Sequence, residues 1–451
     1  MPAVWKKTIA PKALIQNVTE RFHSAFGVKP TGVYSAPGRV NLLGEHIDYC
    51  GGTVLPFALP QRTYVAMSPR QDGQIRAVTA QGDAGSATSH GIKTIAFSEV
   101  SPGALSGWLS YVAGVPWAMD AENQGDFTGF GADIAIDSSV PLGAGLSSSA
   151  ALECAVALGV DDLLSAQDPT RERLASSDAG RAALATATIR AENEIAGAST
   201  GGMDQSISLR ASEGAVLAID CRDFSTRPLT IDMESAGLAI LIMDTRAHHN
   251  LSDGQYAARR ASTEVAKDIL GLASLRDAFE STPTLAKAEA LLADWDARVR
   301  TLSLPEGTDP ATMRDALEHV WTEIARVEEC ISLFEDPQQV PANAWESLGG
   351  LLNDSHDSLR YRYRVSCNEL DVAVEAARAA GALGARMTGG GFGGSAIALI
   401  RQNEITDVAD SVASAFDKAG FDAPEFLVAS PSAPAHAEPA SLKNSCDCPW
   451  G

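Results

Sequence analysis

The sequence predicts a mixed α+β protein built from two lobes. The chain has 451 residues, of which 45% are hydrophobic and 20% charged, which is enough apolar material for more than one core. Its first half mixes strand-like and helix-like segments with glycine-rich turns, whereas its second half opens with a run of amphipathic helices. These patterns place the boundary between the lobes near residues 225–235.

The elements of the first half follow from their hydrophobic patterns. Residues 131–140 alternate apolar and polar side chains, which is typical of a half-buried strand. Small and apolar residues continue almost without interruption over residues 147–158 and indicate a buried helix. A further helix is expected over residues 181–195, and two strands are expected over 217–220 and 238–244.

The second half is predicted to be mainly helical. Its segments are charged and amphipathic, and proline-containing joints separate most of them. A glycine cluster leads from the last helix into a strand over residues 395–400. The expected helices cover residues 258–270, 285–300, 311–333, 344–359 and 369–380.

We therefore expect an N-terminal domain over residues 1–228, a C-terminal domain over 229–430 and a disordered tail over 431–451. The tail is rich in Pro, Ala and Ser, as is common in segments that cannot form a packed core. Its Cys446 and Cys448 form a C-x-C pair without a second half-site, so a disordered tail is the stronger interpretation and a metal site the weaker one.

Charge and composition exclude several classes of partner. The net charge of -22 argues against nucleic acid or an anionic membrane surface. The first twelve residues lack the continuous apolar run of a signal peptide, and no stretch reaches transmembrane length. Seven scattered cysteines, an odd number, suit reduced thiols and hence a cytoplasmic location.

A glycine- and serine-rich segment over residues 141–151 joins the predicted strand to the predicted buried helix. Gly143 and Gly145 let the backbone approach a ligand closely, and Ser147 and its neighbours supply N-cap oxygens where a helix exposes free N–H groups. Such a terminus attracts phosphate. A tight turn with an ordinary serine cap explains the segment equally well. It is not a Walker A loop, because the chain contains no Gly-Lys dipeptide.

A second segment, residues 38–49, sets polar and ionisable groups among aliphatic residues and glycines. A strand that passes into a tight turn there would point Glu45, His46 and Asp48 into one pocket. Carboxylates and an imidazole at this spacing suit a polyol, because they accept hydrogen bonds from adjacent hydroxyls. The spacing matches no usual metal signature, and a buried ion-pair network around Arg39 is the structural alternative.

The glycines at 389, 391 and 394 match G-x-G-x-x-G literally, but they precede a predicted strand instead of following one. This order is the reverse of the dinucleotide-binding arrangement. A glycine hairpin packed near an active site fits the segment better.

In this order, the segments 38–49, 141–151 and 387–394 resemble the three motifs of the GHMP small-molecule kinases. The first is specifically similar to the galactokinase signature, although Ile47 and Cys50 stand where that signature usually has threonine and asparagine. Further matches lie at residues 202–205, around Tyr256, and at Trp108 with Tyr111. The resemblance covers roughly residues 30 to 400, and three ordered motifs are far more specific than one.

The resemblance implies an N-terminal domain of the ribosomal-S5-like kind, a C-terminal ferredoxin-like domain and an active site between them. It also implies a monomer that uses Mg²⁺ and transfers the γ-phosphate of ATP to the O1 hydroxyl of D-galactose, giving α-D-galactose 1-phosphate and ADP. The alternatives are a GHMP kinase for another sugar, such as N-acetylgalactosamine or arabinose, and a sugar sensor without activity.

The resemblance further implies a role for individual residues. Asp204 and Arg39 are expected to be catalytic. Sugar contacts are expected from Glu45, His46, Asp48, Gly202 and Tyr256. Phosphates are expected against Gly143, Ala144, Gly145, Leu146, Ser147, Ser148 and Ser149, adenine against Trp108 and Tyr111, and Mg²⁺ at Ser148 and Glu192.

Two further residue positions are expected to have no part in the chemistry. The pair Arg259 and Arg260 is expected on a helix surface, and Cys154 is expected to be inert packing.

Overall fold

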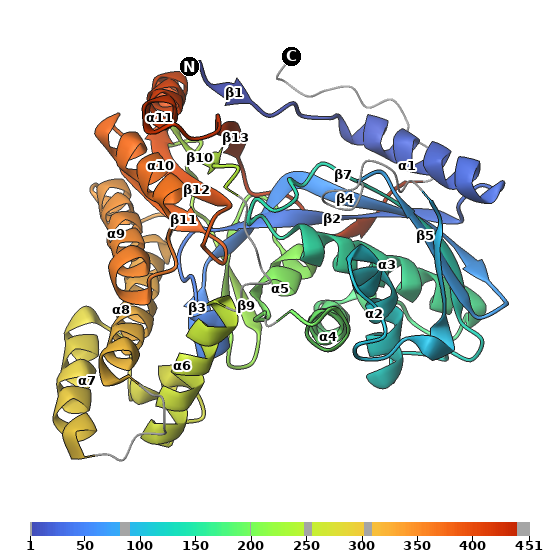
Figure 1. The fold of residues 1–451 in the computed structure, drawn as a ribbon, viewed down its shortest axis with the longest axis horizontal. Coiled ribbons are helices and arrows are strands. Elements are labelled where there is room, and N and C mark those ends of the chain that lie inside the picture. Colours follow the sequence, from blue (N-terminus) through green and yellow to red (C-terminus); the bar gives the residue numbers. More distant parts are fainter. Residues whose placement is uncertain (1, 82–90, 199, 248–254, 302–308, 440–451) are drawn as a thin grey trace.

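A computed structural model of the chain describes residues 2–81, 91–198, 200–247, 255–301 and 309–439 (Figure 1). The described residues form two larger sheets and one small sheet. The strand order is β14-β2-β4-β7-β5-β6 in the six-stranded sheet, β1-β13-β10-β12-β11 in the five-stranded sheet and β3-β8-β9 in the three-stranded sheet.

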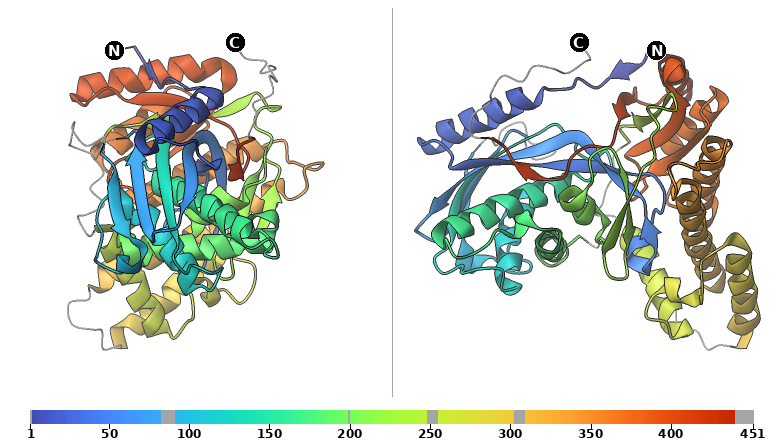
Figure 2. Two further views of the ribbon diagram at one scale, coloured as in Figure 1. Left: turned by 90° about the vertical axis from the view of Figure 1, so that its right-hand side faces the viewer. Right: turned by 180° about the vertical axis from the view of Figure 1, so that it is seen from behind.

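The six-stranded sheet lies between helices on both faces. Helix α1 (Pro11–Phe26) packs on one face, and four helices cover the other (Figures 1 and 2). These four are α2 (Trp108–Ala121), α3 (Ser148–Gln167), α4 (Asp178–Arg190) and α5 (Met203–Arg210). The strands are β2 (Gly32–Asn41), β4 (Pro56–Arg70), β5 (Gln74–Thr79), β6 (Lys93–Ala96), β7 (Gly131–Ser138) and β14 (His436–Ala437).

Strand β7 is buried on both faces, so the expectation of a half-buried strand is wrong. Ile134 and Ile136 belong to the core under α2 and α3, whereas Ala135 packs against α1. The alternation in the sequence reflects this second helical layer, because the polar Asp133 finds Arg70 and Arg76 as ion-pair partners.

The five-stranded sheet belongs mainly to the second half of the chain. Its strands are β1 (Val4–Trp5), β10 (Leu238–Asp244), β11 (Gly384–Thr388), β12 (Ser395–Arg401) and β13 (Glu425–Ala429). Helices α10 (Asn368–Ala379) and α11 (Ile405–Ala419) cover one face and share an apolar core with it. The sheet pairs antiparallel except at β1, which runs parallel to β13.

A column of longer helices stands beside this sheet (Figure 1). These helices confirm the predicted series, with ends that differ from the expected ones by no more than three residues. They are α6 (Gln255–Leu270), α7 (Leu285–Arg298), α8 (Pro310–Phe334) and α9 (Ala344–Ser358). Helices α8 and α9 share one core with the small sheet of β3 (Thr53–Val54), β8 (Val216–Asp220) and β9 (Ser225–Leu229).

The two ends of the chain cross between the sheets. Strand β1 joins the C-terminal sheet, and β14 pairs with β2 of the N-terminal sheet. The expectation of disorder from residue 431 is therefore wrong for residues 431–439. The physical reason is the buried guanidinium of Arg62, which donates to the carbonyls of Ala433 and Pro434 at 2.8 Å each and so fixes this segment. Cys446 and Cys448 lie outside the described residues.

Within the described ranges, no helix is both long enough and apolar enough to cross a bilayer.

Candidate active site

The three sequence motifs meet where the two larger sheets face each other, and glycines permit the contact. A Cβ on Gly389 would lie 2.8 Å from the carbonyl oxygen of Gly145, and a Cβ on Gly394 would lie 3.1 Å from the backbone of Ala144. The hydroxyl of Ser395 donates to the Ala144 carbonyl at 2.7 Å. The third motif is thus the expected glycine hairpin, between β11 and β12, and it packs directly on the loop before α3.

An arginine–aspartate pair lies at the centre of this junction. Arg39, near the end of β2, donates from Nε and Nη2 to the two carboxylate oxygens of Asp204 at 2.9 and 3.0 Å. Its Nη1 donates to the Gly145 carbonyl at 2.5 Å. Burial alone would lower the pKa of Arg39, but the carboxylates of Asp204 and Glu45 raise it, so the guanidinium stays charged.

Ser147 departs from its expected role as a side-chain cap. It occupies the N-cap position of α3 in the left-handed conformation, with φ 58°, and its hydroxyl donates to Asp204 Oδ2 at 2.5 Å instead of capping the helix. The predicted cap is therefore wrong at this position, because the nearby carboxylate is the stronger acceptor. The first N–H groups of α3 are left to face a ligand, as in anion sites at helix N-termini.

Glu45 ties the first motif to the third. It lies in the turn after β2, residues 42–47, which we call the motif turn. Its Oε1 accepts hydrogen bonds from Gly389 N at 2.7 Å and Thr388 Oγ1 at 3.0 Å. Arg386 Nη2 lies 3.3 Å from the same oxygen, and the Arg386 side chain is fully buried. Glu45 is thus held by the third motif from one side, with its charge balanced.

His46 is a neutral imidazole with both ring nitrogens engaged. Burial and the neighbouring His319 lower its pKa to about 3. Nε2 lies 3.2 Å from the Gly390 carbonyl, which only accepts, so Nε2 carries the proton and donates. Nδ1 then accepts from the Tyr49 hydroxyl at 2.8 Å. The imidazole is therefore fixed in one tautomer at the surface of the junction.

Asp48 is packed against a glycine that the sequence analysis did not single out. A Cβ on Gly201 would lie 1.7 Å from Asp48 Oδ2. Burial and the Asp204 carboxylate raise the pKa of Asp48 to about 7. The next residue, Gly202, is equally confined, because its Cβ would lie 2.4 Å from the Phe224 ring. Both glycines are required for the close approach of α5 to the motif turn.

A second carboxylate cluster lies behind the start of α3. Glu192 occupies a π-helical turn (Ala191–Ala196) that continues α4, and its Oε2 accepts from Gln205 Nε2 at 2.6 Å and Thr200 Oγ1 at 2.8 Å. The Ser149 hydroxyl also hydrogen-bonds to Glu192. Gln205 reaches Glu153 Oε2 at 3.2 Å as well, and burial followed by the Glu192 charge raises the pKa of Glu153 far above its usual value.

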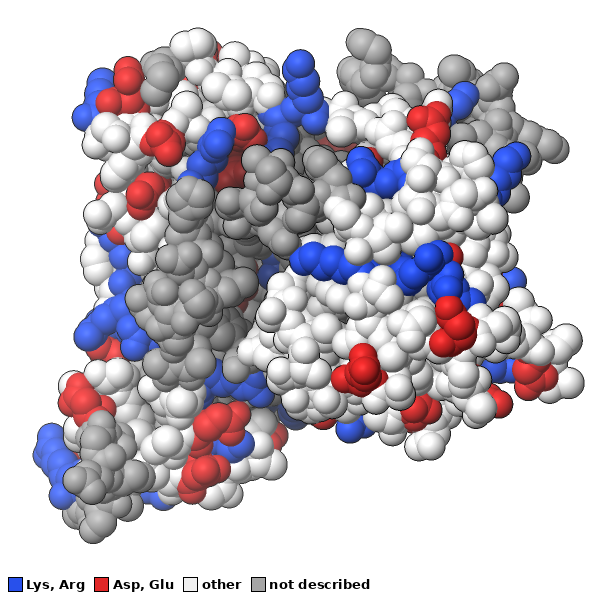
Figure 3. All heavy atoms as spheres, turned by 45° about the vertical axis from the view of Figure 1, so that its right-hand side comes forward, with Lys and Arg blue, Asp and Glu red and all other residues white. Residues whose placement is uncertain are grey.

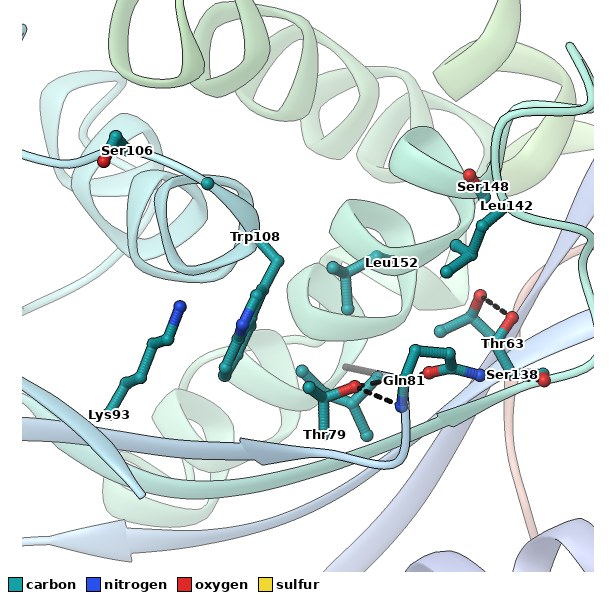
Figure 4. A pocket seen from close by; sticks show the side chains of 12 residues that line it. Thr63, Thr79, Gln81, Lys93, Ser106, Trp108, Ser138, Leu142, Ser148 and Leu152 are labelled. Carbon is teal, nitrogen blue, oxygen red and sulfur yellow. Dashed lines mark hydrogen bonds between the residues drawn. The ribbon is translucent and has the colours of Figure 1, made fainter. Parts of the chain in front are cut away.

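A cavity of about 500 Å³ opens on the far side of the α3 N-terminus (Figure 4). Trp108 stands in its wall with the Lys93 amine 4.9 Å from its ring centroid. Ser148 lines the same cavity, so Trp108 and the serine loop lie together as the resemblance implies. The other lining residues are Thr63, Thr79, Gln81, Ser106, Gly107, Ile136, Ser138, Leu142 and Leu152, none of which the sequence analysis named.

Tyr111 is placed differently from Trp108. It does not belong to the cavity lining, and burial together with the charges of Glu192 and Glu153 raises its pKa to about 12. Tyr111 therefore packs toward the carboxylate cluster.

Two further predictions concern helix α6. Arg260 was expected on a helix surface, but it donates to the Thr200 carbonyl at 3.1 Å and lies 5.8 Å from the Tyr49 ring, so the surface assignment is wrong. Its proximity to Asp48, one of the charges that lower the pKa of that carboxyl, supplies the physical reason. Tyr256 lies in the first turn of α6, but its side chain is outside the part of the structure that is described.

The remaining positions are simple to place. Leu146 is buried and its carbonyl accepts from Arg39 N at 3.1 Å, while Gly143 has a positive φ of 71°. Cys154 is fully buried, as expected for a packing residue. The site residues that sequence reasoning missed are Gly201, Arg260, Arg386, Lys93 and the other cavity residues. Gly201 directly precedes a recognised motif, and this adjacency was the one available signal.

No broad basic surface accompanies the site. On the face shown in Figure 3, acidic and basic side chains are interspersed. Attraction of an anion to this acidic chain therefore relies on local groups, namely Arg39 and the N-terminus of α3.

The chain is similar to known kinases over nearly its whole length. The galactokinase galactose-binding signature matches residues 20–69, the GHMP kinase N-terminal domain matches 110–212 and the GHMP kinase C-terminal domain matches 334–418. The galactokinase of Streptomyces coelicolor is 40% identical over 422 residues, which cover 94% of this chain and 98% of that protein.

Solved structures agree with this similarity. The structure of Lactococcus lactis galactokinase complexed with galactose matches with a TM-score of 0.78 and 26% identity, covering 94% of this chain and 99% of that one. The mevalonate kinase of Methanococcus jannaschii matches with a TM-score of 0.54 and 17% identity, covering 88% of this chain and 98% of that one, which shows a shared fold alone. The predicted α+β GHMP kinase fold is thereby confirmed.

Proposed function

The chain belongs to the galactokinases of the GHMP kinase family, and on that premise we propose that it transfers the γ-phosphate of ATP to the O1 hydroxyl of D-galactose. The products are α-D-galactose 1-phosphate and ADP. One observation carries the proposal beyond family membership: Asp204, held by Arg39 and Ser147, lies directly at the N-terminus of α3. A proton acceptor and a phosphate-binding helix end are thus adjacent.

The sugar is proposed to lie against the motif turn and the start of α5. The groups there are neutral imidazole, carboxylates and closely packed backbone, which suit the donors and acceptors of a hexose. The proposed sugar contacts are Glu45, His46, Asp48, Gly202 and Tyr256. Support comes from the location of the first four around Arg39 and Asp204, where an O1 hydroxyl must lie for transfer.

ATP is proposed to lie across the N-terminus of α3, with its base in the cavity beside Trp108. The cavity volume of about 500 Å³ and its mixed aromatic and hydroxyl lining suit a nucleoside. The phosphates would meet Gly143, Ala144, Gly145, Leu146, Ser147, Ser148 and Ser149. Tyr111 is retained only as a support for the helix that carries Trp108.

Mg²⁺ is proposed to be held by Ser148 and Glu192. Within the described residues there is no cluster of three or more metal-ligating side chains, which fits a Mg²⁺ ion bound by one carboxylate, a hydroxyl and the phosphates of the nucleotide. The buried Glu192 carboxylate supplies the hard oxygen that such an ion prefers. When bound, Mg²⁺ neutralises negative charge on the phosphate oxygens.

The proposed mechanism depends mainly on positioning. Arg39 orients the Asp204 carboxylate by two parallel hydrogen bonds, so that one oxygen is aimed at the O1 hydroxyl. Asp204 accepts the proton of O1 as the O–P bond forms, and ADP leaves with the electrons of the broken P–O bond. The Arg39 charge and the free N–H groups of α3 stabilise the negative charge on the transferring group.

Monomeric state and cytoplasmic location complete the proposal. Every group invoked above belongs to one chain, so no second subunit is needed. The described cysteines are all free thiols, which suits a reducing compartment.

The test is an ADP-release assay with Mg²⁺ and ATP over galactose, galactosamine, N-acetylgalactosamine, glucose, arabinose and mevalonate. We expect turnover with galactose at least about tenfold above that with every other acceptor. Higher turnover with N-acetylgalactosamine or arabinose would replace the sugar assignment and keep the kinase. Saturable galactose binding without any turnover would favour the sensor alternative.

The matched blank is Asp204→Asn. Its amide oxygen still accepts from Arg39 and Ser147, so the variant should fold and bind galactose, as calorimetry can check. Turnover should fall by about 10²–10⁴-fold, the usual contribution of a general base. Near-normal turnover would remove Asp204 from the mechanism.

A further inference from the structure

We propose that His319 and Glu323 of α8 are positioning residues that hold the motif turn in its sugar-binding shape. They touch the turn only through its backbone, and they come from the opposite half of the chain. The inference rests on the proposed function, because it concerns the sugar site named there.

The motif turn has an unusual backbone that needs support. Gly44 has φ 100° and His46 has φ 62°, so two left-handed residues flank Glu45. The left-handed conformation costs a non-glycine residue about 1–3 kcal/mol and persists only where neighbours over-determine it. The aliphatic side chains of the turn, Leu42, Leu43 and Ile47, are fully buried in the core that α8 shares.

Glu323 binds the N–H group at the start of this turn. Gly44 N donates to Glu323 Oε1 at 2.9 Å, and the Ser355 hydroxyl of α9 donates to the same oxygen at 2.8 Å. Arg326 Nε donates to Oε2 at 2.9 Å. Burial would raise the pKa of Glu323, but Arg326 and His319 lower it to about 2, so a fully buried, charged acceptor faces the Gly44 amide.

His319 binds the carbonyl at the middle of the turn. Its Nε2 lies 3.0 Å from the Glu45 carbonyl oxygen and its Nδ1 lies 2.9 Å from the Ser358 hydroxyl. Since a carbonyl only accepts, Nε2 carries the proton and Nδ1 accepts from Ser358. Burial lowers the pKa of His319 to about 4, so this arrangement persists at neutral pH.

An aromatic contact reinforces the same link. The Tyr363 ring lies 4.7 Å from the His319 ring and 5.0 Å from the His46 ring, and its hydroxyl lies 2.9 Å from that of Tyr49. Tyr363 thus fills the space between the positioning histidine and the proposed sugar-contacting histidine. The peptide groups and the His46 ring of the turn are both held from α8 and its neighbours.

These contacts act on the sugar side alone. Glu45 and His46 are the proposed sugar contacts, whereas the residues that line the nucleotide cavity come from β4 to β7 and from the start of α2 and α3. Loss of the α8 contacts should therefore weaken galactose binding and leave ATP binding unchanged.

The test is a matched pair at one position. In His319→Gln, the amide nitrogen takes the place of Nε2 and can still donate to Glu45 O. In His319→Asn, the shorter side chain reaches only the place of Nδ1, so the Ser358 contact survives and the Glu45 contact is lost. The galactose Kd is measured by calorimetry, the KM for galactose and for MgATP by ADP release, and Tm by calorimetry.

We expect His319→Asn to raise the Kd and KM for galactose by about tenfold, since a buried carbonyl loses its donor. His319→Gln should stay within about threefold of the parent, and the KM for MgATP should change by less than about twofold in both. A purely structural role would lower Tm without this difference between the two variants. Equal galactose Kd values in both variants, or a parallel rise of both KM values, would overturn the proposal.

Glu323→Gln keeps the inference testable if His319→Asn does not fold. The amide oxygen retains the Gly44 contact but is neutral, and charged acceptors make the stronger hydrogen bonds. Galactose Kd should rise by about threefold with the KM for MgATP unchanged, and an unchanged galactose Kd contradicts the proposal. Absence of galactose phosphorylation by the parent protein would instead refute the proposed function, so the two failures are distinguishable.

Discussion

Three carboxylates, those of Glu45, Asp48 and Asp204, surround the single buried guanidinium of Arg39. Asp204 takes both of its parallel hydrogen bonds, and Glu45 is balanced by Arg386 from the third motif. Asp48 is left with the weakest compensation, which explains why its pKa is raised. The alternative of a purely structural ion-pair network is therefore too simple, because such a network would pair Asp48 as well.

The raised pKa of Asp48 makes stability depend on pH. In the unfolded chain Asp48 loses its proton near its usual pKa of 3.8, whereas the folded protein keeps the proton up to about pH 7. The folded state thus binds one more proton between these values. Its stabilising effect is complete below about pH 3.8 and is lost as pH rises toward 7, by up to about 1.4 kcal/mol per pH unit.

Asp48→Asn should abolish this component. Urea unfolding of sugar-free protein at pH 5, 6, 7 and 8 should show a stability loss with rising pH that is shallower in the variant than in the parent. Equal slopes in the two proteins would show that Asp48 does not retain its proton in the fold.

Gly201 offers a second prediction at the same scale. The atom that meets its added Cβ is the end of a movable side chain, Asp48 Oδ2 at 1.7 Å, so Gly201→Ala should cost little stability but displace the carboxylate. The galactose KM should rise by about tenfold or more, with the KM for MgATP changed far less. Gly350→Ala in α9 is the matched control, because its Cβ meets nothing within 4 Å. An unchanged galactose KM in Gly201→Ala would argue against Asp48 as a sugar contact.

At the scale of elements, the sequence predicts what local patterns determine. The helices α6 to α10 and the strand β10 appear close to their expected bounds, because their apolar periodicity and proline joints are local signals. The junction of the three motifs is also predicted, since each motif is contiguous in the chain. The contact that sets the shape of the motif turn is not predicted: Glu45 and His319 are 274 positions apart, and no local pattern joins them.

The misses at this scale share a physical cause. Ser147 loses its capping role to a carboxylate 57 positions away, and Arg260 leaves the surface because Asp48 and the Thr200 carbonyl attract it. Strand β7 reads as half-buried because the second helical layer, α1, comes from a distant part of the chain. In each case a tertiary partner overrides a local preference.

At the scale of the whole molecule, the exchange of chain ends fastens the two sheets to each other. Residues 431–439 leave the C-terminal sheet after β13 and cross to the N-terminal sheet, where β14 covers the edge of β2. Three backbone amides along this crossing meet carbonyls of the N-terminal lobe or donate to the crossing carbonyls, as between Ser432 N and Ala58 O at 2.9 Å and Ala435 N and Ser208 O at 2.8 Å. An exposed strand edge is thereby removed.

This crossing predicts opposite outcomes for two truncations. A chain that ends at Pro439 keeps every described contact of the segment and should unfold at the same denaturant concentration as the parent. A chain that ends at Ser430 leaves the Arg62 guanidinium, 5% exposed, without its carbonyl partners at 433 and 434. It also removes the Ala435 carbonyl that Arg181 donates to at 2.9 Å.

Because a buried charge left without partners costs about 3–5 kcal/mol, we expect a loss of that order in the shorter chain. Guanidinium unfolding followed by tryptophan fluorescence measures it, and the parent unfolded in parallel gives the reference midpoint. Equal midpoints for the two truncations would mean that water replaces these carbonyls and that the crossing segment only covers the β2 edge. A large loss confined to the shorter chain would instead make residues 431–439 an integral part of the N-terminal lobe, despite their distance from it in sequence.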